Sequence, residues 1–387
     1  MTPTNDEPIR PWLLRWAVLG LIVAGAAVQI ALSAYYLSVA HAPTPRQLPV
    51  GYVAPPASAG QVEANIENGG RFAATRYDSA GSMIAAIKDK TVYGGLDVST
   101  DPPRLYVASA AGTAASTALR TAFTAVVQQQ TTTQVQQLVT AGQPVPPATL
   151  QQLTTPPAIT DVVPLPPNDR TGASIGLLVQ ALAIGATVAS MGLGRIGART
   201  RPSLTRGIGH TVVMLAYAAA SAGAVLAAGH VFGIVPAGAD ARLFWAFLLV
   251  SVAITGSVAG LVALIGPAGS FLGTAYFVFG VPISGATVLP EFMPTAVRAL
   301  GQALPTGAGA TLVRDSLYFP TTYVTRPAIT LGLYARIGIV LVLLTNALGN
   351  RSPRESLLDV TPRPEPTSAA SSAPTAGPSS PAPSAGR

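Results

Sequence analysis

Side chains that could carry chemistry are few, because only 10% of the 387 residues are charged and there are no cysteines. Without cysteine, a disulfide framework, a thiolate zinc site and a thiol nucleophile are excluded. The histidines are His41, His210 and His230, and no His/Asp/Glu group has metal-ligand spacing. The chain also lacks the G-x-x-x-x-G-K-[ST] loop that cradles a triphosphate. We therefore expect a protein that is not an enzyme and that holds no metal and no cofactor.

One charged side chain falls inside an apolar segment. Arg336 lies within the last apolar run, where an arginine costs about 2.5–3.5 kcal/mol at the bilayer centre. Two interpretations stay open: Arg336 reaches the outer membrane boundary, or it faces a cavity or a partner helix. The apolar segments contain no Asp or Glu, so His210 and His230, near the two ends of the third segment, lack a carboxylate partner there. Both histidines are thus either interfacial or part of a relay whose acid is missing.

Long apolar segments must position these residues. The chain is 49% hydrophobic, with a mean hydropathy of +0.45, and it has too little charge to cover a water-facing surface. A helix of about 20 apolar residues crosses a bilayer. The sequence therefore predicts an α-helical polytopic membrane protein with about six transmembrane helices. The predicted spans are 16–39, 174–193, 210–235, 244–265, 271–289 and 328–349.

A segment of different composition, residues 43–170, separates the first two spans. Charges, turn residues and alternating apolar residues return here, in a pattern of five strands and three helices. Strands that alternate with helices predict a small α/β domain, and about 120 residues suffice for one hydrophobic core.

Arginine placement in the short loops predicts the orientation of the spans. The loop between spans two and three is rich in arginine, whereas the loop between spans three and four holds only Arg242. We therefore expect the first loop to be cytoplasmic and to be the surface that could contact an ATPase. Its arginines are Arg195, Arg199, Arg201 and Arg206.

The same rule places the remaining segments. The N-terminus, residues 1–15, and a Pro/Ser/Ala-rich disordered tail, residues 350–387, are expected in the cytoplasm. The α/β domain is then extracytoplasmic. Arginine, alanine, glycine and proline usage suggests a GC-rich bacterial genome, so the expected location is the bacterial cell (plasma) membrane. Membrane lipid is the expected partner, and nucleic acid is not, because no basic patch is interleaved with aromatic residues.

Residues 290–326, between the fifth and sixth spans, are predicted to form a helical hairpin at the outer membrane surface. Pro294 can open a helix over 295–304, residues 306–309 read as a turn, and a second helix follows over 310–318. The hairpin is either a structural cap or a gate on the outer mouth of the bundle. The charged residues expected to hold it are Glu291, Arg298, Arg314 and Asp315.

Short motifs occur in a recognisable order along residues 12–349. The order is one span, an extracytoplasmic domain and a five-span block. In this the chain resembles the ABC type-2 permease superfamily, and most closely its Pip-like (phage infection protein) branch of bacterial membrane proteins. The motifs are LPVGYV at 48–53, AAI at 85–87, VYGGL at 92–96, VASAAG at 107–112, DVVPL at 161–165 and LPTGA at 304–308, with Arg314 and Tyr318-Phe319 before the last span.

The resemblance implies the permease subunit of an exporter that moves an unknown substrate out of the cell with a separate cytoplasmic ATPase. It also implies a second permease copy in a homo- or heterodimer. A low-charge cavity would suit an amphiphilic substrate. The chain departs from the family pattern because only about a dozen residues precede the first span, where type-2 permeases often carry an amphipathic helix. The alternative is a non-transporting envelope scaffold, a secretion accessory or a phage-adsorption protein.

Overall fold

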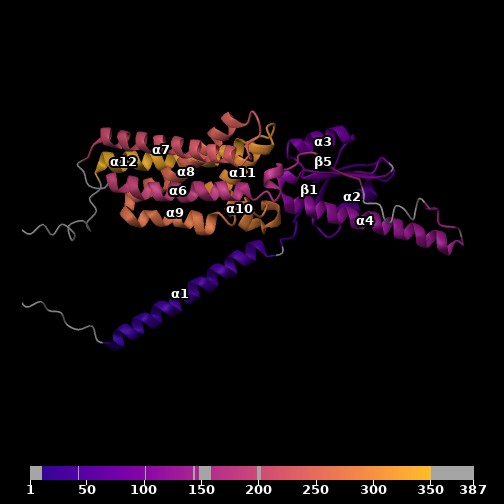
Figure 1. Ribbon diagram of the computed structural model, residues 1–387, viewed down its shortest axis with the longest axis horizontal. Coiled ribbons are helices and arrows are strands. Elements are labelled where there is room, and N and C mark those ends of the chain that lie inside the picture. The colour runs from indigo at the N-terminus through magenta and orange to yellow at the C-terminus, as the bar shows by residue number, and fades with distance from the viewer. Residues whose placement is uncertain are drawn as a thin grey trace, which may run out of the picture. The chain divides into compact units, whose positions relative to one another are not determined.

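The computed structural model describes residues 11–41, 43–100, 102–142, 144–147, 158–197 and 202–349. The chain divides into two units, Met1–Asn350 and Arg351–Arg387, and the second unit lies outside the described residues. The tail predicted at 350–387 and residues 1–10 of the predicted N-terminal segment therefore fall outside the description as well (Figure 1).

The described residues include five helices that are long and apolar enough to cross a membrane. The protein is therefore a helical polytopic membrane protein. These helices carry most of its exposed large apolar side chains, as contact with lipid requires. They are α1 (Pro11–Ala40), α6 (Ser174–Gly197), α7 (Leu204–Val231), α8 (Asp240–Ile265, counted together with the residues up to Gly280) and α12 (Thr325–Leu348).

The span predicted at 271–289 is a short, broken helix. After α8, the 3-10 turn η3 (Gly266–Ser270) folds the chain back, and it continues as α9 (Phe271–Ala275) and the π-helical turn η4 (Tyr276–Gly280). Regular helix ends there because Pro282 has no backbone N–H to donate. The next residues form turns, in which Gly285 takes a φ of 86° that a residue with a side chain rarely adopts.

The α/β domain follows α1 and is built on a five-stranded sheet of order β2-β1-β3-β4-β5. The β1–β2, β1–β3 and β4–β5 pairs are parallel and β3–β4 is antiparallel. This confirms the predicted pattern of five strands and three helices. The elements are β1 (Leu48–Val53), α2 (Ala59–Glu67), β2 (Phe72–Arg76), α3 (Ala80–Lys88), β3 (Gly94–Asp97), β4 (Arg104–Val107), α4 (Thr113–Thr140) and β5 (Ala158–Asp161).

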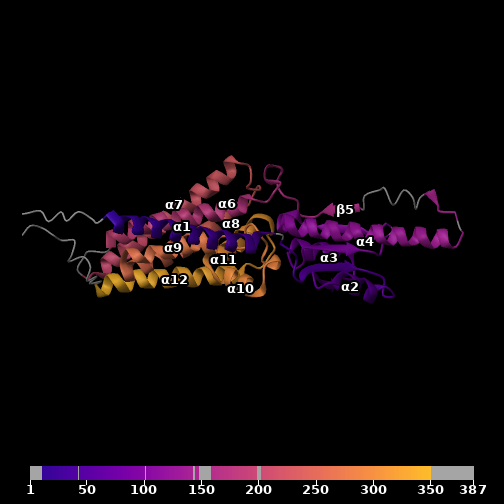
Figure 2. The same cartoon turned by 90° about the horizontal axis from the view of Figure 1, so that it is seen from below.

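Helices cover both faces of this sheet. Neighbouring residues of β3 show the two layers, because Gly94 lies against Leu119 of α4 and Gly95 lies against Met83 of α3. Helix α2 shares the α4 face, where the Tyr52 hydroxyl of β1 donates to Glu63 of α2 at 2.8 Å. Helix α4 runs along the sheet and continues past it (Figures 1 and 2). The α/β domain therefore has three layers, with α3 on one side and α2 and α4 on the other.

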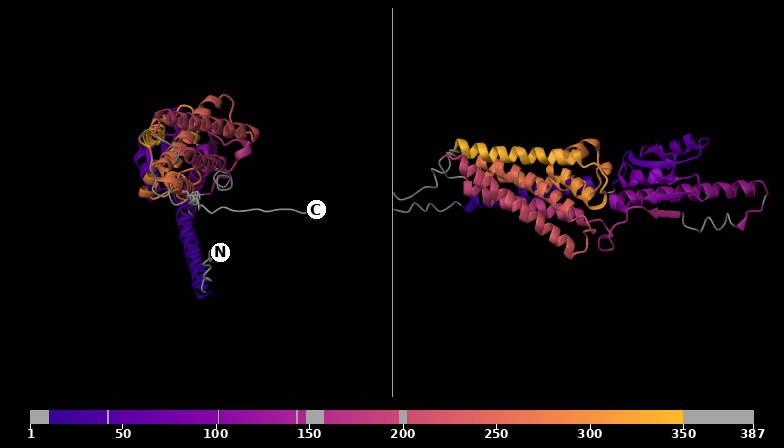
Figure 3. Two further views of the ribbon diagram at one scale, coloured as in Figure 1. Left: turned by 90° about the vertical axis from the view of Figure 1, so that its left-hand side faces the viewer. Right: turned by 90° about the horizontal axis from the view of Figure 1, so that it is seen from above.

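Helices α6 to α12 form one bundle around α8 (Figure 3). Residues 250–260 of α8 are all buried, and α6, α7 and α12 pack against them. Two shorter helices, α10 (Thr295–Ala303) and α11 (Pro305–Tyr318), follow a 3-10 turn, η5 (Pro290–Phe292). They form the predicted helical hairpin.

The hairpin differs from the prediction in two ways. Residues 306–309 were expected to be a turn but form the first part of α11, because Pro305 starts the helix with the φ that a first helical turn needs. Gly307 also approaches the backbone of Gly301 so closely that a Cβ there would lie 2.0 Å from the Gly301 carbonyl oxygen. The second helix is not a surface element either: α11 is buried along nearly its whole length against α8, α12 and α6.

Candidate functional site

A cluster of ionisable side chains lies where the α/β domain meets α11 and the turns that precede α10. We call it the junction cluster. Each member is buried or half-buried, and Glu291, Arg314 and Asp315 each act electrostatically on at least one other member. Its members are Lys90, Tyr93, Glu291, Arg314 and Asp315.

The central contact is an ion pair between the two parts of the protein. The Lys90 ammonium donates to Asp315 Oδ1 at 2.5 Å, with side-chain exposures of 11% and 5%. Burial lowers the pKa of Lys90, and the neighbouring Asp315 carboxylate opposes this shift. The ammonium also lies 5.8 Å from the ring centroid of Phe319. Both charges are thus removed from water, and each depends on the other for compensation.

Local structure fixes the position of Lys90. Helix α3 ends at Lys88, and Lys90, two residues on, has a φ of 55°. A lysine pays a conformational cost in this left-handed region, where glycine is the usual residue after a helix. The same helix end is held to the loop after α11, because Thr321 and Thr322 donate to Asp89 at 2.5 and 2.9 Å.

Arg314 holds the turns that follow η4. Its guanidinium is buried and donates to the carbonyl oxygens of Gly285 and Ala286, at 2.9 Å each. These carbonyls belong to the broken part of the predicted fifth span, where regular helix no longer supplies partners. A second arginine, Arg242 of α8, contacts α11, the helix that carries Arg314. Its Nε donates to the Ser316 carbonyl oxygen at 2.5 Å.

Tyr93 and Glu291 complete the junction cluster. Burial, reinforced by the Glu291 carboxylate, raises the pKa of the Tyr93 phenol well above its usual value. One carboxylate oxygen of Glu291 and the hydroxyl of Tyr318 are buried and have no hydrogen-bond partner within the described part of the chain. Buried polar atoms of this kind are rare in native proteins.

A cavity of about 190 Å³ adjoins the junction cluster. Arg314 forms part of its wall, together with the starts of α4 and α6 and the turn at Ala286 and Thr287. Apolar side chains seal the surrounding contact: Leu289 packs on Gly112, and Phe292 and Phe319 share one hydrophobic cluster with Val107. The junction therefore combines an apolar seal with a charged, incompletely satisfied interior.

No protein-family model, curated protein or solved structure matches the chain. No group of three metal-ligating side chains occurs among the described residues. The geometry of the junction cluster shows a mechanical connection between two parts of a membrane protein.

The structure brings together three of the four residues predicted at the outer hairpin. Glu291, Arg314 and Asp315 belong to the junction cluster, whereas Arg298 lies on α10, half-exposed, without an ion pair in the described part of the chain. The sequence prediction missed Lys90 and Tyr93. A signal for Lys90 was available, because the chain holds 23 basic residues and only Lys88 and Lys90 are lysines.

The predicted ATPase-contact loop is only partly described. Arg199 and Arg201 lie outside the described residues, and of Arg195 only the backbone, at the end of α6, is described. Arg206 lies in the first turn of α7, where its backbone N–H donates to the side chain of Ser203, the helix N-cap. The backbone N–H of Ser203 donates to the Asn346 carbonyl at 2.9 Å, which holds the start of α7 beside the end of α12.

The two histidines of α7 differ. His210 is buried, and neither ring nitrogen has a partner among the described residues. His230 pairs with Asp240 at the start of α8, and both side chains are about half exposed at 52%. The acid that pairs with His230 comes from the start of α8, outside the predicted apolar segments, in which the sequence contains no Asp or Glu.

Arg336 is exposed in the middle of α12 and points away from the bundle of its own chain.

We expect Arg336→Leu to raise the efficiency with which α12 inserts into a membrane, because an arginine at mid-span costs about 2.5–3.5 kcal/mol. A glycosylation-mapping insertion assay measures this. Arg326→Leu, at the exposed start of the same helix, is the control and should change little. If Arg336→Leu instead inserts as efficiently as the wild type but no longer supports export, Arg336 contacts a helix of another subunit.

Proposed function

We propose that this chain is the permease subunit of a bacterial exporter, which moves an amphiphilic substrate outwards with a separate cytoplasmic ATPase. The observation that carries the proposal is the buried Lys90–Asp315 pair. It ties the α/β domain to α11, a helix that lies inside the bundle. A rearrangement of the bundle around α11 must then move the α/β domain or break the pair. Apolar side chains of similar size would hold a static domain equally well, because replacing a buried ion pair by apolar groups is often neutral or stabilising.

The ends of the helices support a consistent topology. The start of α8 and the end of α11 lie together through Arg242 and Ser316, at the end of the bundle that contacts the α/β domain. The start of α7 and the end of α12 lie together through Ser203 and Asn346. We place the first end outside the cell and the second in the cytoplasm, beside the arginine-rich loop and both termini.

This topology needs six passes, and the broken segment supplies one of them. It begins with η3 at the far end of α8 and ends at Leu289, which contacts Gly112 of the α/β domain. The chain therefore returns along the bundle between these points. Counting 266–289 as the fifth pass leaves both termini on one side of the membrane and the α/β domain on the other, in agreement with the proposed orientation.

Continuous packing favours the second candidate, a non-transporting envelope scaffold. Residues 250–260 of α8 and nearly all of α11 are buried within this one chain. An exporter would need its pathway between two copies, consistent with the dimer that the type-2 permease resemblance implies. The buried Lys90–Asp315 pair, which couples the α/β domain to a helix inside the bundle, supports the exporter over the scaffold.

Co-purification from the native membrane tests the exporter. We expect a P-loop ATPase to be recovered with the full-length chain, and the Arg199→Glu/Arg201→Glu variant to lose both the ATPase and export. Arg170→Glu, an exposed arginine before α6 on the opposite side in this topology, is the control and should retain both. Absence of any ATPase, together with a silent Arg199→Glu/Arg201→Glu variant, would reject the exporter and leave the scaffold.

A further inference from the structure

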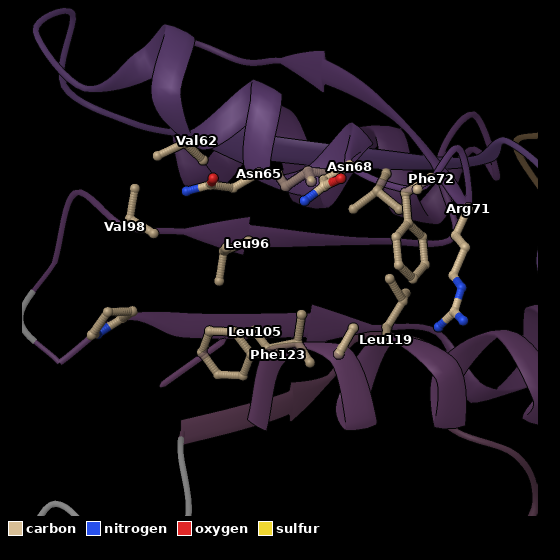
Figure 4. A pocket seen from close by; sticks show the side chains of 15 residues that line it. Val62, Asn65, Asn68, Arg71, Phe72, Leu96, Val98, Leu105, Leu119 and Phe123 are labelled. Atoms are coloured by element: carbon tan, nitrogen blue, oxygen red, sulfur yellow. The ribbon is translucent and has the colours of Figure 1, made fainter. Parts of the chain in front are cut away.

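The α/β domain contains a cavity of about 460 Å³, whose lining includes no member of the junction cluster. It lies on the face of the sheet that α2 and α4 cover, and four strands contribute to its floor (Figure 4). This volume is within the range of about 300–1,000 Å³ that small-molecule sites occupy. The side chains that define its interior are Val62, Ile66, Phe72, Leu96, Leu105 and Phe123.

The walls of the cavity are fixed by the fold. In the middle of α2 the Tyr52 hydroxyl donates to Glu63, and at the C-terminal end of α2 the Ala74 N–H of β2 donates to Glu67. On the opposite wall, Leu119 and Phe123 of α4 are buried. Helix α2 is therefore held to strands β1 and β2, while α4 packs over β3, and the space between the two helices stays open. A cavity held in this way needs little reorganisation to accept a ligand.

The chemistry of the lining restricts the ligand. The interior is made of aliphatic and aromatic side chains, which would leave the hydroxyls of a sugar or nucleoside buried without partners, at about 1–3 kcal/mol each. The polar side chains of the lining are Asn65, Asn68 and Arg71, and all three are exposed. Arg71 makes no ion pair within the described part of the chain. The cavity thus has an apolar interior and a cationic entrance.

We propose that this cavity binds a single-chain anionic amphiphile. Its apolar chain would lie over Phe72 and Leu96 towards Val62 and Val98, which are at the end of the cavity opposite Arg71 (Figure 4). Its carboxylate or phosphate would accept hydrogen bonds from the Arg71 guanidinium, whose planar donors suit both groups. The proposal does not depend on export, since a scaffold could hold the same ligand.

Photolabelling of the full-length protein in lipid nanodiscs tests the site. The probe is dodecanoate that carries a diazirine at the end of its chain, and mass spectrometry locates the label. We expect label on peptides of α2, β3 and α4, and competition by unlabelled dodecanoate or dodecyl phosphate. Dodecanol, which lacks the charge, should need at least about tenfold more. Labelling confined to the membrane helices, or equal competition by dodecanol, would overturn the proposal.

Four variants separate binding from folding. Arg71→Gln should lower labelling about tenfold, because a charge-assisted contact is lost, and Arg71→Lys should retain most of it. Leu96→Trp should block labelling by filling the cavity. Arg104→Gln removes an exposed arginine of β4, beside the lining but not part of it, and should change nothing. Equal labelling of Arg71→Gln and Arg104→Gln, or normal labelling of Leu96→Trp, would contradict the site.

Discussion

Asp315→Asn is expected to lower the free energy of unfolding by about 3–5 kcal/mol, because it leaves the buried ammonium of Lys90 without its carboxylate. The loss should be large because the partners are 11% and 5% exposed, so water cannot replace the missing charge. Unfolding of the full-length protein at fixed detergent composition, followed by circular dichroism, measures the change.

Two further variants identify the cause. Asp78→Asn removes an exposed carboxylate near the start of α3 and should cost less than about 0.5 kcal/mol. Lys90→Met/Asp315→Leu removes both charges and should recover most of the loss, since replacing a buried ion pair by apolar groups is often neutral or stabilising. If Asp315→Asn is no more destabilised than Asp78→Asn, the pair does not hold the α/β domain to α11.

The junction cluster shows what the sequence could not supply. Arg314 and Asp315 were recognisable because charges are rare beside apolar segments and therefore attract attention. Lys90 stood out only as one of two lysines, and its pairing with Asp315 was not recognisable because the two residues are 225 positions apart in the chain. Pairing over such a separation leaves no trace in local composition or periodicity. A sequence pattern locates charges that are costly, but only the fold determines which charges meet.

The membrane helices were predictable for the opposite reason. A run of about 20 apolar residues is a local signal, and five predicted spans correspond to α1, α6, α7, α8 and α12. The boundaries were less reliable: the third was predicted from residue 210, but α7 begins at Leu204, after the N-cap Ser203. Capping by a serine side chain starts the helix before its apolar stretch.

Close packing of α11 against α8 explains why the turn predicted at 306–309 was wrong. The turn expected at 306–309 was inferred from glycine, which marks turns when no other context is known. In the structure these small residues instead let α11 enter the bundle, where Gly309 lies against Val250 of α8. Glycine at a helix–helix contact and glycine in a turn have the same sequence signal, so only the packing distinguishes them.

A close backbone contact between two membrane helices gives a second large effect. Helices α8 and α12 make the most extensive contact in the bundle, and a Cβ at Gly338 would lie 2.1 Å from the backbone carbon of Gly256. Gly338→Ala should therefore lower the free energy of unfolding by about 3 kcal/mol, at the upper end of overpacking effects, because the obstacle is backbone that cannot rotate aside. Unfolding under the conditions used for Asp315→Asn measures it.

Gly332→Ala is the matched control, since it lies on the same helix with nothing within 4 Å of the added Cβ. There the substitution should stabilise by about 0.5–1 kcal/mol through helix propensity alone. Opposite signs at two positions six residues apart would show that contact with α8 determines the outcome, because the chemical change is identical. If both variants gain stability, α12 does not pack on α8 at Gly256. Since α11 packs on both α8 and α12, its burial between them would then be contradicted as well.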